Sequence, residues 1–201
     1  SYLLLFQINI KYQIKIKVYN SNMLGHKEIL KMGNPILRKI AEPFTDEEIK
    51  SKETKSLIKK MWQIMDEAGG IGLAAPQISV SKQLAIIKLD ESSERYPEIE
   101  SSPEYVMFNP RIEYLTEKKQ GNWEGCLSVP GLRGYVERPS QISVKFIDEN
   151  LEFKKLNLEG FLATVFQHEI DHLYGKLYVD RVENKELLMY EDELKKLDNE
   201  I

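Results

Sequence analysis

The pentapeptide His168-Glu169-Ile170-Asp171-His172 combines two imidazoles and a carboxylate at a spacing that suits hydrolytic metal chemistry. Residues four apart on a helix share a face, so the imidazoles of His168 and His172 can reach one metal ion. Glu169 is rotated off that face but stays within reach of a bound water, where a general base must lie. The same pattern arises by chance on ordinary helices, so it needs support from the rest of the chain.

A catalytic metal also needs a third protein ligand beside an open position. No histidine follows His172, which excludes the downstream ligand of metzincin proteases, whereas Glu186 or Glu191 is a formal candidate of the gluzincin kind. Cys126, the only cysteine, is the other candidate. A thiolate with two imidazoles suits Zn²⁺ or Fe²⁺, although a lone cysteine is most often a small buried hydrophobe.

The glycine-rich segment at residues 70–75 has a competing interpretation as a dinucleotide-binding fingerprint, with Asp90 about 20 residues further on. That fingerprint must follow a strand and open a helix, whereas this segment follows a predicted helix over residues 56–68. Residues 77–83 then separate it from the next predicted strand, too few for a crossover helix. We therefore do not expect a dinucleotide site.

Composition excludes several other classes of function. The chain of 201 residues has a net charge of −4, which argues against nucleic acid as the main ligand because phosphate binding needs a basic face. No apolar run approaches the roughly 20 residues of a membrane-spanning helix. A single cysteine cannot form an internal disulfide, so a reducing compartment is favoured.

The hydrophobic patterns predict an α+β fold in which antiparallel sheets pack around a central buried helix that carries the pentapeptide. That helix is expected from about residue 160 to 173, and a C-terminal helix from about residue 184. The apolar face of this last helix comprises Leu187, Tyr190, Leu194 and Leu197. Residues 91–104 resemble a surface loop, and strands are predicted over residues 84–89, 105–108, 142–147 and 151–158, the last two joined by an Asp-Glu-Asn turn.

The N-terminal residues 1–27 differ from the rest of the chain. They alternate apolar and polar side chains from Phe6 to Val18 and contain no acidic residue before Glu28. Such a segment suits either an organellar transit peptide or an edge strand whose lysines block aggregation. The chain begins with Ser1, which favours removal of something upstream, and His26 is expected at the surface.

Three segments occur in order: Gly70–Gln77, Glu124–Ser128 and Gln167–His172. Together they resemble the three signature motifs of the peptide deformylase family, and the resemblance extends from about Glu28 to about Asp180. Gly131 departs from the Glu that is common in bacterial members, so the resemblance specifies neither the subfamily nor the residues of the outer pocket. The resemblance implies a catalytic domain at 28–183 and leaves the acid-free leader and the terminal helix uncovered, so the chain is expected to comprise a leader or edge strand at 1–27, this domain, and an amphipathic helix at 184–201.

The resemblance also implies a role for particular residues. One divalent metal, Fe²⁺ most naturally and Zn²⁺ possible, is expected on Cys126, His168 and His172. Proton transfer is expected from Glu169, and oxyanion stabilisation from the side chain of Gln77 and the backbone N–H of Leu127. The expected substrate-binding residues are Gly70, Ile71, Gly72 and Gly125 for the peptide backbone, Ile71, Phe161, Val165 and the stem of Glu124 for the methionine side chain, and Arg133 with Arg138 for the region beyond.

The activity implied is hydrolysis of the N-formyl group from the formylmethionine of nascent polypeptides, with release of formate. A zincin endopeptidase is the main rival, but it requires neither the Cys126 segment nor the Gln77 loop. A structural zinc domain is the second rival; it usually needs more cysteines and leaves Glu169 without a role.

Partners and location follow from this activity. The expected partners are formylated nascent peptides, and transient proximity to the ribosome is expected as well. We expect no direct binding to nucleic acid or to a membrane, and the sequence does not specify the oligomeric state. Residues 183–200 carry seven acids against three lysines, so this tail is repelled by rRNA and should pack on the domain or a second subunit. The acid-free leader and a bias to Lys, Ile, Asn and Tyr favour a plastid-type organelle such as an apicoplast, with the bacterial cytoplasm as the alternative.

Overall fold

The computed structural model describes residues 29–89 and 101–198. The predictions for residues 1–27, for His26 and for most of the loop at 91–104 therefore lie outside the described residues. Within the described ranges, no helix is both long and apolar enough to span a membrane.

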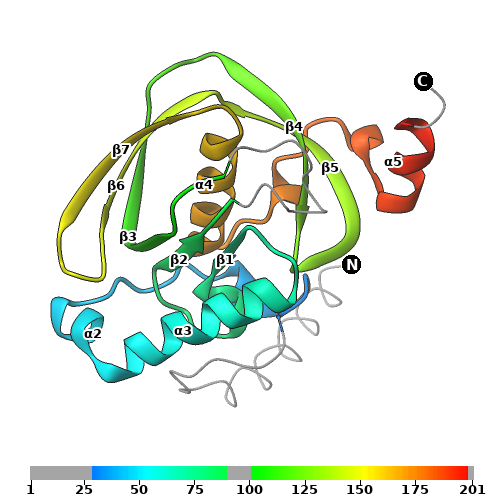
Figure 1. The fold of residues 1–201 in the computed structure, drawn as a ribbon. Helices are drawn as coiled ribbons and strands as arrows, with labels where there is room; N and C mark the ends of the chain where they lie inside the picture. The colour runs from blue at the N-terminus through cyan, green and yellow to red at the C-terminus, as the bar shows by residue number, and fades with distance from the viewer. Residues whose placement is uncertain (1–28, 90–100, 199–201) are drawn as a thin grey trace, which may run out of the picture.

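The described residues combine helices with antiparallel strands (Figure 1). The α-helices are α2 (Asp46–Lys50), α3 (Lys52–Glu67), α4 (Gly160–Leu173) and α5 (Glu191–Asp198). The short 3₁₀ helices are η2 (Pro35–Arg38), η3 (Ala75–Ile78), η4 (Tyr178–Asp180) and η5 (Lys185–Leu187). The strands are β1 (Gly72–Ala74), β2 (Leu84–Ile87), β3 (Tyr105–Tyr114), β4 (Lys119–Cys126), β5 (Val129–Pro139), β6 (Gln141–Ile147), β7 (Phe153–Glu159) and β8 (Leu188–Tyr190).

Two antiparallel sheets meet around α4. The larger sheet has the order β1-β2-β3-β6-β7 and the smaller one the order β4-β5-β8. Figure 1 shows α4 in the centre, with β6 and β7 on one side and β4 and β5 on the other, and α4 contacts strands of both sheets. This confirms the predicted α+β architecture around a buried central helix.

The helix α3 covers the larger sheet and precedes the glycine-rich segment. Ser51 caps its first turn by accepting a hydrogen bond from the backbone N–H of Thr54. Its buried side chains recur at helical spacing and pack with β2 and β3 in one cluster: Leu57, Ile58, Met61, Ile64 and Met65. The helix ends before Gly69, whose φ of 61° is easily adopted only by glycine.

The C-terminal prediction needs correction, because residues 184–198 do not form one helix. Leu188–Tyr190 form β8, which pairs with β5, and α5 begins only at Glu191. The free edge of β5 offers backbone hydrogen bonds that outweigh the local helical preference of this segment. Tyr190 and Leu197 of the predicted apolar face are 64% and 49% exposed.

The glycine-rich segment enters a hairpin and not a nucleotide-binding loop. Gly72–Ala74 form β1, which pairs antiparallel with β2, and the short η3 helix connects to β2 without a crossover helix. The predicted turn after β6 is also present, since the carboxylate of Asp148 accepts hydrogen bonds from the backbone N–H groups of Asn150 and Glu152. The strand after it, β7, begins at Phe153 and not at Leu151.

Candidate active site

The helix α4 places two histidines and a glutamate inside the protein. It begins at Gly160, whose φ of 63° turns the chain from β7 into the helix. From Ala163 onward nearly every side chain is buried, because the helix lies between the two sheets. His168, Glu169 and His172 therefore face the interior, where water is scarce and electrostatic interactions are strong.

Cys126 reaches the same point from the end of β4. The pairing of β4 with β5 shifts register between Glu124 and Cys126, and such a bulge redirects the side chains that follow. The thiol Sγ lies 3.3 Å from Nε2 of His172. The ligand atoms of Cys126, His168 and His172 all lie within 4.8 Å of one another, and all three residues are buried. A buried thiol and two imidazoles that converge in this way fit a divalent transition metal.

The proposed ligands are mutually tuned. Burial raises the pKa of the Cys126 thiol, but the nearby His172 and His168 outweigh it and bring that pKa well below its ordinary value. The thiolate is the form that binds metals. Glu191 and Glu186 were the alternatives to Cys126 as the third metal ligand. Glu191 forms an ion pair with Arg133, and neither glutamate belongs to the metal-binding group found among the described residues.

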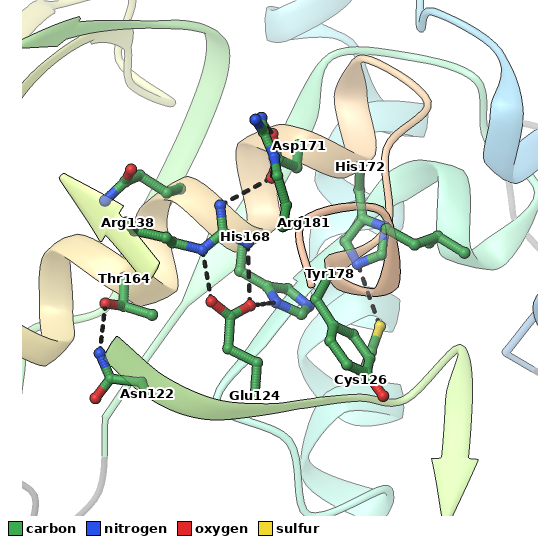
Figure 2. A network of polar contacts seen from close by, with 12 residues as sticks. Asn122, Glu124, Cys126, Arg138, Thr164, His168, Asp171, His172, Tyr178 and Arg181 are labelled. Atoms are coloured by element: carbon green, nitrogen blue, oxygen red, sulfur yellow. Dashed lines mark hydrogen bonds and ion pairs between the residues drawn. The ribbon is translucent and has the colours of Figure 1, made fainter. Parts of the chain in front are cut away.

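A buried ion-pair network orients His168 (Figure 2). Glu124 accepts from Nδ1 of His168 at 2.8 Å, so the other ring nitrogen is left for the metal centre. Arg138 donates hydrogen bonds to both carboxylate oxygens of Glu124 and also to Asp171 at 2.9 Å. Asp171 in turn accepts from Arg181 at 2.6 Å. The pKa of Glu124 is lowered: burial opposes the shift, but His168 and Arg138 outweigh it.

Glu169 has the properties of a general base at neutral pH. It is 5% exposed, and its Oε2 has no hydrogen-bond partner among the residues that the structure describes. Burial raises its pKa to about 7, against the opposing effect of His168 and His172. A Cβ on Gly72 would lie 2.5 Å from Oε1 of Glu169, so only glycine allows β1 to pass this close to the carboxylate.

Gln77 is fixed with its amide nitrogen toward Cys126. Its Oε1 accepts from the backbone N–H of Ala74 at 2.8 Å. That bond leaves Nε2 to donate to Ser128 Oγ at 3.1 Å and to contact Cys126 Sγ at 3.6 Å. The residue is 1% exposed and lies on η3, directly after β1.

One cavity collects most of the residues predicted from the sequence. Its lining includes Gly70, Ile71, Gly72, Gln77, Glu124, Gly125, Cys126, Leu127, Phe161, Val165, His168 and Glu169. His172 lies behind it and is 1% exposed. Arg133 and Arg138 do not line it; both are buried in ion pairs, with side chains 8% and 4% exposed.

The sequence prediction missed two residues of the lining, Trp123 and Thr164. Thr164 lies one helical turn before His168 and accepts from Asn122 Nδ2 at 3.1 Å. Trp123 directly precedes Glu124 on β4. The i, i+4 spacing to His168 could have identified Thr164, and adjacency to the second motif could have identified Trp123.

Comparison with known proteins decides the family. Residues 26–187 match the family of polypeptide deformylases. This chain belongs to the peptide deformylase family. The peptide deformylase of Leptospira biflexa is 47% identical over 168 residues, which are 84% of this chain and 94% of the relative. Peptide deformylase 2 of Pseudomonas putida is 43% identical over 158 residues, 79% of this chain and 88% of the relative.

Solved structures of deformylases have the same fold. A class I type b peptide deformylase from Acinetobacter baumannii with bound Met-Ala-Ser is 37% identical, with a TM-score of 0.73 over 77% of this chain and 96% of that chain. The Thermotoga maritima peptide deformylase is 33% identical, with a TM-score of 0.69 over 79% and 99%. The match confirms the resemblance carried by the three motifs and, with it, favours a deformylase over an endopeptidase or a structural zinc domain.

Proposed function

We propose that this chain is a metal-dependent deformylase, which hydrolyses the N-formyl group of formylmethionine on nascent polypeptides and releases formate. The observation that carries the proposal is the convergence of Cys126, His168 and His172 on a cavity that Glu169 and Gln77 also line, in a member of the deformylase family. A lone cluster of ligands fits many metalloproteins, but the buried carboxylate and amide beside it fit amide hydrolysis.

Cys126, His168 and His172 would hold a divalent ion, Fe²⁺ most naturally and Zn²⁺ also accepted. Such an ion would supply Lewis-acid chemistry for the hydrolysis of the formyl amide. Glu124 and Arg138 keep His168 in the orientation that presents its second ring nitrogen.

Residues of the chain transfer the proton and stabilise the negative charge that develops on the substrate oxygen. Glu169, with a pKa of about 7, accepts a proton from the attacking water and delivers it to the departing amine. The amide of Gln77 and the backbone N–H of Leu127 donate to the oxygen that becomes negative. Removal of one such donor typically costs about 10²–10³ in rate.

Two glycine-containing segments contribute to the cavity lining. Gly70, Ile71 and Gly72 come from one segment and Gly125 from the other, so we expect an extended peptide to pair with their backbone groups. The methionine side chain enters the apolar part, lined by Phe161 and Val165. The bound Met-Ala-Ser of the Acinetobacter baumannii relative supports a peptide of this length.

The division of the chain and its location are also proposals. Residues 28–183 are the proposed catalytic unit, and the family match over 26–187 supports it while extending slightly past both of its bounds. The relatives named above are bacterial. They support the bacterial cytoplasm, and none of them supports a plastid-type organelle.

The activity is tested with formyl-Met-Ala-Ser and, as a matched control, acetyl-Met-Ala-Ser. We expect formate and a free amine in equal amounts from the formyl peptide and slow or no reaction of the acetyl peptide. Cleavage of an internal bond instead would support an endopeptidase, and no cleavage of either would support a structural metal site. Metal analysis of protein purified without oxygen identifies the native ion.

A further inference from the structure

The segment after residue 187 lies beyond the family match but touches the peptide-binding side of the molecule. The match ends at 187, and Leu188–Tyr190 immediately form β8 along β5. In this pairing Met189 lies opposite Arg133. The next residue after β8, Glu191, begins α5 and pairs with Arg133, whose Nη2 lies 2.9 Å from its carboxylate.

Arg133 lies next to a residue of the cavity lining. A Cβ placed on Gly125 would come within 2.9 Å of Nη1 and 3.0 Å of Cζ of Arg133, so the guanidinium packs closely against this glycine. Gly125 lines the cavity itself. The guanidinium charge is therefore one residue away from the space in which a peptide is proposed to bind.

A cation in that place would favour acidic peptides. The Arg133 side chain is 8% exposed, so its charge is less screened than that of a surface arginine. Glu191, at 32% exposure, supplies the opposite charge, and Lys195 approaches the same carboxylate at 3.9 Å. The pair presents a nearly neutral surface to the peptide.

We propose that Glu191 sets the charge preference of the cleft for residues beyond the formylmethionine. By neutralising and holding Arg133 next to Gly125, it lets the enzyme accept acidic and basic nascent chains alike. This inference rests on the proposed deformylase function, and it assigns a role in substrate selection to the C-terminal segment.

The test compares formyl-Met-Ala-Asp with formyl-Met-Ala-Lys in Glu191→Gln, which keeps the side chain's size and removes its charge. The ratio of kcat/KM for the acidic peptide over the basic one should rise about threefold, the size of a partly screened ion pair, and the change should appear in KM. Glu193→Gln is the matched control: it makes the same charge change on the same helix, but Glu193 pairs with the exposed Lys196. Its ratio should stay that of the wild type.

A second variant tests whether Glu191 acts on peptide preference through Arg133. In Arg133→Met, the further change Glu191→Gln should leave the ratio unaltered, because no buried cation remains to be released. An unchanged ratio in Glu191→Gln alone, or an equal rise in Glu193→Gln, overturns the inference while leaving the deformylase function intact. Absence of formate release from all peptides by the wild-type enzyme overturns the function, and the inference with it.

Discussion

The carboxylate of Glu124 contacts both the proposed metal centre and a buried arginine. The sequence motif places Glu124 in the substrate pocket, and its stem does line the cavity. Its two oxygens, however, bond His168 and Arg138, which gives it a positioning role on the metal ligand. The partner of this carboxylate could not be read from the motif, because Arg138 lies 14 residues away and on another strand.

Replacing Glu124 with Gln should weaken metal binding about 10- to 100-fold, the usual cost of losing the group that orients a ligating histidine. The amide keeps the shape but presents no charge to His168 and Arg138. Competition with a chelator measures the affinity. Glu137→Gln, an exposed carboxylate next to Arg138 in sequence, is the control and should leave the affinity unchanged. Equal affinities in the wild type and Glu124→Gln would contradict the positioning role.

Glu169→Ala should retain one metal per chain but lose turnover by about 10²–10⁴-fold, because the residue moves a proton and is not a ligand. Metal analysis and formate release measure the two properties separately. Glu159→Ala removes an exposed carboxylate just before the same helix and should alter neither. Loss of the metal from Glu169→Ala would place this residue among the ligands.

At the scale of elements, the long helices α3 and α4 were more predictable than the smaller sheet. The bounds of α4 agree with the predicted helix over 160–173, because a long apolar run at helical spacing specifies a buried helix locally. The strands β4 and β5 were not predicted. Glycines and charged residues interrupt their patterns, as in the run Gly131-Leu132-Arg133-Gly134, and pairing between distant segments stabilises them.

The capping box of α2 makes a contribution to stability that depends on pH. Glu48 accepts from Lys82 and from the backbone N–H of Thr45, and these bonds, Lys82 first, lower its pKa. A carboxylate whose pKa is lower in the folded state stabilises the fold at pH values above its ordinary pKa. This stabilisation is lost as the pH falls through the folded-state pKa. Glu48→Gln should therefore cost about 0.5–1 kcal/mol at pH 6 and less at pH 3.

Urea unfolding at the two pH values measures this difference. Glu117→Gln, an exposed site between β3 and β4, is the control and should follow the wild type at both. A cost for Glu48→Gln that is as large at pH 3 as at pH 6 would show that the cap acts through its shape and not its charge.

The strand β8 should contribute more to stability than the helix after it. Ending the chain after Leu187 leaves the edge of β5 without a partner and should lower Tm by at least about 2–4 °C, the effect of roughly 1 kcal/mol in a domain of this size. Ending it after Tyr190 keeps β8 and removes α5 alone, so the loss should be smaller. Neither truncation should weaken co-sedimentation with ribosomes, because the tail is acidic. Equal Tm values for both truncated chains would show that α5 carries the stability.

At the scale of the whole molecule, the proposed metal would connect elements that lie far apart in the sequence. Cys126 comes from the smaller sheet, whereas both histidines come from α4, which packs against the larger one. Gln77 adds a contact from η3 after the β1 strand. The site is therefore complete only when both sheets are docked on the central helix.

Removal of the metal should accordingly lower the stability of the entire fold. An ion present at 100 times its Kd stabilises the protein by about 2.7 kcal/mol, so chelation should lower Tm by roughly 5–10 °C. Thermal unfolding with and without chelator measures the shift. Cys126→Ser, which removes the thiolate, should show little difference between the two conditions. A large chelator effect that persists in Cys126→Ser would mean that the metal is bound elsewhere.

The separation of β5 and β8 along the chain has a consequence for biosynthesis. Chains fold from the N-terminus as they are made, at about 5–20 residues per second, and here β8 is translated well after β4 and β5, the strands that it joins in the smaller sheet. Until β8 has been made, β5 exposes an unpaired edge, the kind of surface that recruits strands from other chains. Each new copy therefore passes through a short interval in which crowding of polysomes favours aggregation, and that interval ends when Leu188–Tyr190 emerge and pair with Leu132–Gly134.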